Sequence, residues 1–188
     1  GWLEDALAEH ASVASFARAT LELVAVGAPP SLLAAHQRAA LQEIRHAQRC
    51  FALARAYGDL PVDPGVLAVP SARGGGLVRL STDTFVEGCV AESVGALMAA
   101  RALEECTLPE ARSALAMIAT DEAAHAALAW RTLAWALNQG GDPATRAVLA
   151  RAASLRDELC IRGEDSAPGA AAQRGELRAH GRLTDDDV

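Results

Sequence analysis

Two short motifs in this chain combine a glutamate and a histidine at helical spacing. Glu43 precedes His46 by three residues, and Glu122 precedes His125 by three residues. Residues three apart lie on one face of a helix, so each motif would present a carboxylate beside an imidazole. Both motifs continue apolar stripes, where an unpartnered carboxylate is costly to bury. A bound metal ion would remove that cost, so we expect metal binding at these residues.

One further glutamate precedes each motif at nearly equal distance. The sequence separation between Glu9 and Glu43 is 34, and that between Glu87 and Glu122 is 35. The chain therefore repeats one unit: a glutamate, a helix, a short proline-containing loop and Glu-x-x-His. In the alternative interpretation, satisfied or surface carboxylates accompany two core histidines. The agreement in helical phase disfavours that alternative.

Glu92 is an ambiguous candidate, because it comes five positions after Glu87, about 140° around an ideal helix. It is open whether Glu92 is a surface carboxylate, an extra ligand or the ligand of this helix. The spacing favours Glu87. The separation between Glu87 and Glu122 is 35, which is closer to the 34 of the first unit than the separation of 30 between Glu92 and Glu122. A π-bulge in this helix would instead rotate Glu92 towards the metals.

These residues resemble the ferritin-like di-iron carboxylate superfamily, in which two helices each supply a glutamate and two supply Glu-x-x-His. The resemblance covers about residues 3–138 and implies a ferritin-like four-helix bundle. It implies two bound Fe ions, with Mn as the alternative, because the ligands mix oxygen and nitrogen. The implied ligands are two terminal carboxylates, two bridging carboxylates and two histidines: Glu9 and Glu87, Glu43 and Glu122, and His46 and His125.

Two polar residues next to the motifs are candidates for supporting roles. Asp121 directly precedes Glu122, and in members of the superfamily such an aspartate hydrogen-bonds a ligand histidine. A carboxylate there fixes the tautomer of the imidazole and raises its basicity. Gln42 holds the equivalent position before Glu43 and carries no charge. An exposed Asp121 without this role remains the alternative.

Apolar stripes at helical spacing, separated by proline- and glycine-containing segments, predict an all-α chain of four long helices. We expect these at about residues 2–26, 32–57, 81–105 and 110–138, with a shorter helix at 144–160. Short loops make each successive pair an antiparallel hairpin, and the proline- and glycine-rich segment 59–80 is long enough to cross between the pairs. We expect a metal-binding bundle at 1–140, an additional helix at 141–162 and a loose or truncated tail at 163–188.

The composition limits the classes of partner. The chain has 44 Ala among 188 residues, its 17 basic residues are all Arg, and its net charge of -7 argues against nucleic acid. No apolar run approaches the roughly 20 residues of a membrane span. Four isolated cysteines are expected to be small core residues rather than disulfides. The chain begins at Gly1, so an upstream signal or anchor stays open, with a cytoplasmic location slightly favoured.

The resemblance implies a binuclear-metal oxidoreductase that activates dioxygen or peroxide and acts on a small substrate not identified by the sequence. The ligand set does not choose between hydroxylase, ferroxidase, peroxidase and catalase chemistry. One alternative is a ferritin-like ferroxidase that handles iron, as a homo-oligomer or in a shell. The other is a non-catalytic helical interaction module that a metal stabilises.

Overall fold

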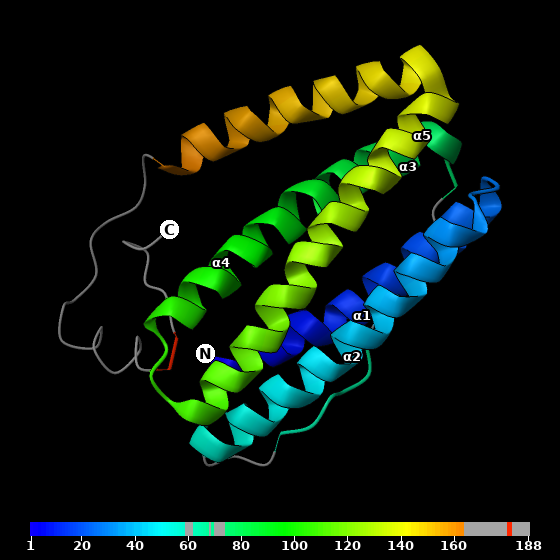
Figure 1. The fold of residues 1–188 in the computed structure, drawn as a ribbon. Helices are drawn as coiled ribbons and strands as arrows, with labels where there is room; N and C mark the ends of the chain where they lie inside the picture. The colour runs from blue at the N-terminus through cyan, green and yellow to red at the C-terminus, as the bar shows by residue number, and fades with distance from the viewer. Residues whose placement is uncertain (59–61, 68, 70–73, 164–179, 182–188) are drawn as a thin grey trace.

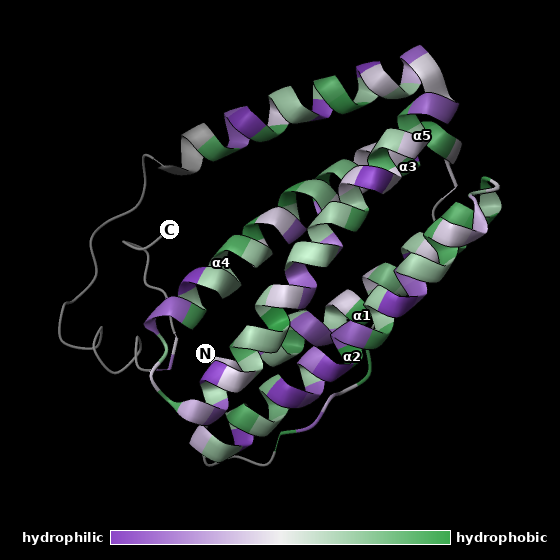
Figure 2. Ribbon diagram, viewed as in Figure 1, coloured by the Kyte–Doolittle hydropathy of each residue, from purple (hydrophilic) through white to green (hydrophobic). Residues whose placement is uncertain are grey.

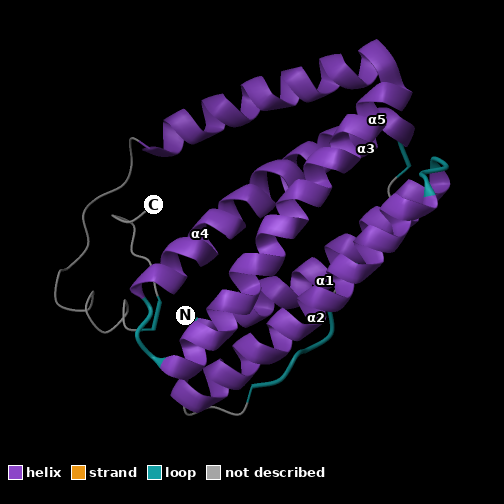
Figure 3. Cartoon of the chain, in the orientation of Figure 1, coloured by secondary structure: helices purple, strands orange, loops and turns teal. Residues whose placement is uncertain are grey.

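A computed structural model of the chain describes residues 1–58, 62–67, 69, 74–163 and 180–181. Every regular element among these residues is helical, and none is a strand (Figure 3). The predicted all-α class is therefore confirmed. The elements in chain order are α1 (Trp2–Ala25), α2 (Pro30–Gly58), α3 (Gly76–Asp83), η1 (Thr84–Val90), α4 (Ala91–Glu105) and α5 (Pro109–Gly163).

The helices α1 and α2 form the first hairpin. Their boundaries lie within two residues of those predicted, because Gly27-Ala28-Pro29 ends one helix and Pro30 fits the first position of the next. At the turn, the Ala28 amide donates to the Leu23 carbonyl at 3.0 Å. The two helices pack along each other, as Figure 1 shows.

The second half of the fold contains a π-helical segment. Helices α3 and α4 join through η1, whose amides bond five residues back rather than four. The helical run starts at Gly76, earlier than the predicted 81. Gly88 allows η1 to approach α5 closely, since a Cβ there would lie 2.9 Å from the Ala129 Cβ.

A sharp kink divides α5. The predicted break near residues 140–143 occurs at Gly141, whose φ of 57° and ψ of -149° are not helical, and Pro143 follows it. Beyond the kink the helix turns away from its earlier direction and continues to Gly163 (Figure 1). The predicted tail at 163–188 lies almost wholly outside the described residues, and the proposed division into domains stays a prediction.

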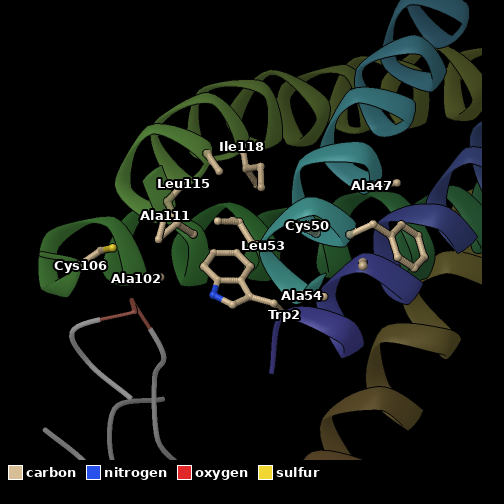
Figure 4. Packing of buried hydrophobic residues seen from close by; sticks show 13 residues of the cluster. Trp2, Ala47, Cys50, Leu53, Ala54, Ala102, Cys106, Ala111, Leu115 and Ile118 are labelled. Atoms are coloured by element: carbon tan, nitrogen blue, oxygen red, sulfur yellow. The ribbon is translucent and has the colours of Figure 1, made fainter. Parts of the chain in front are cut away.

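The apolar core flanks a polar layer. One cluster gathers around Trp2, Phe51 and Ile118, and Figure 4 shows Trp2 beside Leu53 in it. Other clusters form around Phe16 and Leu128 and, farther along α1, around Leu23. Along α2 and α5 the buried carboxylates and histidines lie between residues of these clusters, and half-buried Glu9 lies between Ala6 and Phe16 on α1. The packed ends of the helices therefore hold the polar layer in place.

The distribution of polar residues and the burial of the cysteines follow from the sequence pattern. Hydrophilic and hydrophobic residues interleave along the helices (Figure 2), and no described helix is long and apolar enough to cross a membrane. Cys50, Cys89 and Cys106 are buried core residues, as the sequence predicts. The side chain of Cys160 is outside the described part.

Candidate metal centre

Two overlapping groups of ligand atoms lie in the polar layer. In each group, one ligand atom per residue lies within 4.8 Å of the others. Glu43 and Glu122 belong to both groups. The full sets are Glu9, Glu43, His46 and Glu122, and Glu43, Glu92, Glu122 and His125. The residues come from α1, α2, α4 and α5, so four helix segments converge on one site.

Both histidines turn Nδ1 towards the carboxylates. His46 Nδ1 lies 3.3 Å from Glu9, 3.6 Å from Glu43 and 3.4 Å from Glu122. His125 Nδ1 lies 2.8 Å from Glu43, 3.5 Å from Glu122 and 3.8 Å from Glu92. Each histidine therefore faces both of the shared carboxylates and one carboxylate of its own.

The opposite ring nitrogens are held by partners from across the site. His46 Nε2 lies 3.1 Å from Asp121 Oδ2, and His125 Nε2 lies 3.0 Å from Gln42 Oε1. Gln42 Nε2 also donates to Asp121 Oδ1 at 2.5 Å. Because both residues accept, each imidazole carries its proton on Nε2 in the neutral form, and Nδ1 is left as a donor atom for a metal. Asp121 therefore contacts the histidine of α2, and Gln42 contacts that of α5.

Glu87 does not lie in the site that the sequence favoured for it. Its side chain is 43% exposed and pairs with Arg18 of α1. Glu92, the second choice in the sequence, instead joins Glu43, Glu122 and His125. The π-helical turn anticipated as the alternative is η1, directly before α4. An extra residue in a turn rotates the rest of the helix by about 100°, which redirects Glu92.

The separations from the second hairpin turn agree with the position of Glu92. The sequence separation between Glu92 and Glu105, where α4 ends, is 13, and that between Pro109, where α5 begins, and Glu122 is also 13. Equal separations place two residues at the same height in an antiparallel pair. Glu87 has a separation of 18 from Glu105, and the excess of five positions displaces it by about 7.5 Å along the axis.

The buried histidines carry a strong preference for charge. Burial alone would lower the pKa of both, but the facing carboxylates outweigh it. Glu122, Glu43 and Glu9 raise the pKa of His46 to about 12. Glu122 and Glu43 raise the pKa of His125 to about 9. In the metal-free protein, cationic imidazoles therefore balance part of the buried negative charge.

The carboxylates divide into two kinds. Burial raises the pKa of Glu9 to about 7, and burial with repulsion from Glu122 raises the pKa of Glu92 to about 9. Burial opposes ionisation of Glu43 and Glu122 as well, yet attraction to the nearby imidazoles of His125 and His46 lowers the pKa of both, that of Glu122 to about 2. The two shared carboxylates therefore favour ionisation more strongly than Glu9 and Glu92 do. A bound metal cation would displace the protons that the buried carboxylates and imidazoles hold in the metal-free protein.

Buried polar atoms that lack hydrogen-bond partners indicate whether a metal fits the site. His46 Nδ1, His125 Nδ1 and Glu43 Oε2 are buried and form no hydrogen bond within the described part of the chain. Glu43, His46 and His125 are 1%, 0% and 2% exposed, so bulk solvent does not reach them. Orphaned buried polar atoms are costly, and these converge on one another. Carboxylate and imidazole donors in this mixture suit two Fe or Mn ions.

The remaining histidines and Tyr57 lie outside both groups. His36 is buried in α2, with Nε2 3.0 Å from Thr132 Oγ1. His10 contacts the Gly65 carbonyl at 3.0 Å and so ties the connecting segment to α1. Tyr57 packs against His180, with ring centroids 4.6 Å apart.

Sequence reasoning missed Arg18, whose buried side chain lies beside the site. Its Nε is 3.9 Å from Glu22 Oε1, in addition to the pair with Glu87. It carries no motif, and the only signal in the sequence is a basic residue on the buried face of the first helix.

Comparisons with known proteins returned no matching family model, no matching curated protein and no matching solved structure.

Proposed function

We propose that this chain is a binuclear-metal oxidoreductase of the ferritin-like four-helix-bundle type. The observation that supports it most is the pair of ligand groups that share Glu43 and Glu122. Two carboxylates common to both groups suit two adjacent metal ions, which we propose to be Fe, with Mn as the alternative. Iron bound there would supply the redox chemistry for activating dioxygen or peroxide.

The chain's own residues have separable roles in this proposal. Glu43 and Glu122 would hold both ions, while His46 with Glu9 and His125 with Glu92 would each hold one. Asp121 and Gln42 orient the two imidazoles through Nε2 and keep Nδ1 directed inward. Phe16 covers His125, with ring centroids 5.1 Å apart, and limits access of water on that side.

Space for a small reactant supports the proposal. A cavity of about 60 Å³ borders Glu92 and His125 and is lined mainly by apolar groups of Phe16, Leu80 and Ala129. A volume of this size exceeds what one water molecule needs. An apolar cavity beside carboxylate and imidazole donors suits dioxygen or peroxide.

The test is anaerobic loading with ferrous iron, followed by addition of oxygen. We expect two Fe per chain, oxygen consumption and near-ultraviolet absorption of ferric iron. Glu43→Ala and Glu122→Ala should abolish all three, because each removes a carboxylate that both ligand groups share. Glu104→Ala, on an exposed position of α4, is the matched control. The site would be refuted if wild type bound well below two Fe per chain and Glu43→Ala and Glu122→Ala bound the same amount.

Two further measurements separate the alternatives. Iron handling would give a large assembly in size-exclusion chromatography and ferrous iron oxidation without an organic substrate. A metal-stabilised interaction module would give a higher melting temperature on metal loading with no oxygen consumption.

A further inference from the structure

A large groove runs between α1 and the η1–α4 segment. Its volume is about 750 Å³, within the range of pockets that take organic ligands. Glu9, Glu92 and Glu122 form part of its wall. The groove therefore opens directly onto carboxylates of the candidate metal centre, on the side away from the two histidines' Nε2 partners.

The groove is long and its two ends differ. Its wall on α1 extends from Trp2 to Arg18, about 24 Å along the helix. The Trp2 end is apolar, with Met98, Leu115 and Ile118. The other end is polar, and there Ser12 and Ser15 join the Arg18–Glu87 pair. The metal ligands lie between the two ends.

Small residues of α4 keep the groove open. Ala91, Gly95 and Ala99 recur every four residues on the wall opposite α1. A Cβ built on Gly95 would meet one neighbouring atom within 4 Å, Glu122 Oε2 at 3.4 Å. The open space therefore continues down to a carboxylate that both ligand groups share.

The charge of the wall restricts what can bind. Arg18 is the one basic residue among the described residues that line the groove, and Glu87 already neutralises it. Near Trp2 the wall also carries Glu4, which pairs with the Gly1 amine, and Asp5, so charge there is acidic or already paired. Both cations of the described wall, the Gly1 amine and Arg18, are paired with glutamates, so a ligand carrying a carboxylate would meet the like charge of Glu9, Glu92 and Glu122, which opposes binding.

We propose that this groove binds an elongated, uncharged organic molecule with an apolar tail and a hydrogen-bonding head. The tail lies at the Trp2 end, the head lies near Ser12 and Ser15, and the middle of the molecule faces the metal centre. This names a substrate class for the proposed function and rests on it for catalysis. Binding itself depends only on the groove.

Calorimetry on the metal-free protein at pH 8 tests the binding, with octanamide, its shorter homologues and octanoate as probes. We expect affinity for the amides to rise about fourfold with each added methylene, as the tail enters an apolar groove. Octanoate, with the same tail and an anionic head, should bind at least tenfold more weakly than octanamide. Equal binding of octanoate, or no gain with chain length, would overturn the proposal.

Blocking variants locate the site. Ala99→Phe should fill the apolar part and weaken octanamide binding at least tenfold, whereas Ala100→Phe, one residue along α4 and exposed, should not. Ser12→Leu tests the polar end, with exposed Ala11→Leu as its control, and serves as the blocking variant if Ala99→Phe does not fold. Unchanged binding in a folded blocking variant would overturn the proposal.

Metal analysis of the same samples keeps the two proposals distinguishable. Octanamide binding without metal uptake would refute the proposed function and support the groove. Two Fe per chain without octanamide binding would support the metal centre and overturn the groove.

Discussion

The two hairpins bring matching glutamates to the candidate metal centre through different helix geometries. Helix α1 runs without interruption past Glu9, whereas the helix that carries Glu92 passes first through the π-helical segment η1. The sequence separation between Glu9 and the last residue of α1 is 16, and that between the first residue of α2 and Glu43 is 13. In the second hairpin both separations are 13 for Glu92 and Glu122.

This difference explains why a near-perfect repeat in the sequence is not a repeat in space. Total spacing adds the loop to the two helix segments, so a shorter loop or an extra π residue shifts it. Separation from the hairpin turn matches the pairing of Glu92 with Glu122, whereas Glu9 and Glu43 come together although their separations differ by three. The four residues between Ala25 and Pro30 and the three between Glu105 and Pro109 contribute to total spacing but carry no ligand.

The largest predicted effect contrasts Glu92 with Glu87. Glu92→Gln should reduce the metal stoichiometry from two to about one per chain, because it removes a carboxylate from one ligand group. Glu87→Gln should leave two metals bound, since Glu87 pairs with Arg18 instead. Metal analysis after gel filtration measures both. Loss of a metal in Glu87→Gln alone would restore the assignment that total spacing favoured.

The next effect compares the two supporting residues. Asp121→Asn should weaken binding of the metal on the His46 side about 10- to 100-fold, because it removes the charge that orients that imidazole. Gln42→Met should weaken the metal on the His125 side by a smaller factor, since Gln42 is neutral. Competition with a chromophoric chelator resolves the two affinities.

Gln48→Met, exposed on the same helix α2, controls for substitution at a glutamine. A larger loss in Gln42→Met than in Asp121→Asn would contradict the ranking by charge. Loss of both metals to the same extent in either variant would show that the two halves do not act separately.

The sequence predicted most of the fold and part of the site, for identifiable reasons. Proline and glycine punctuation located the helices, and i,i+3 spacing identified Glu43 with His46 and Glu122 with His125. The Asp121–His46 contact also agrees with the role suggested by its position. The choice of Glu92 could not be made, because a π-helical turn is favoured by packing between helices rather than by local propensity. The close approach at Gly88 is one such contact.

His36 differs from the histidines of the site in that its pKa is lowered, and this should make the stability of the protein fall at acidic pH. Burial, with the charge of His125, lowers the pKa of His36 to about 4. Between pH 6.5 and 4 the unfolded chain binds a proton at this residue that the folded protein does not. The free energy of unfolding therefore falls as the pH falls, by on the order of 3 kcal/mol for this group.

Urea unfolding of metal-free wild type and His36→Gln across this range measures that contribution. The variant should lose less stability than wild type between pH 6.5 and 4, and the difference between them should be constant above pH 7. The carboxylates of the site titrate in both proteins and largely cancel in the comparison. A difference that does not change with pH would contradict a neutral, buried His36.

The smallest predicted effect concerns the role that Glu87 has in place of metal binding. Its pair with Arg18 joins α1 of the first hairpin to η1 of the second, and the Arg18 side chain is 12% exposed. Because the Glu87 side chain is 43% exposed, solvent screens the pair, and we expect a coupling free energy of about 1 kcal/mol. A double-mutant cycle of Arg18→Met and Glu87→Gln, read by urea unfolding of the metal-free protein, measures it. Added salt should reduce the coupling, since one partner is exposed. Zero coupling would mean that the pair does not stabilise the joint between the hairpins, and the position of η1 would then depend on its packing against α5 alone.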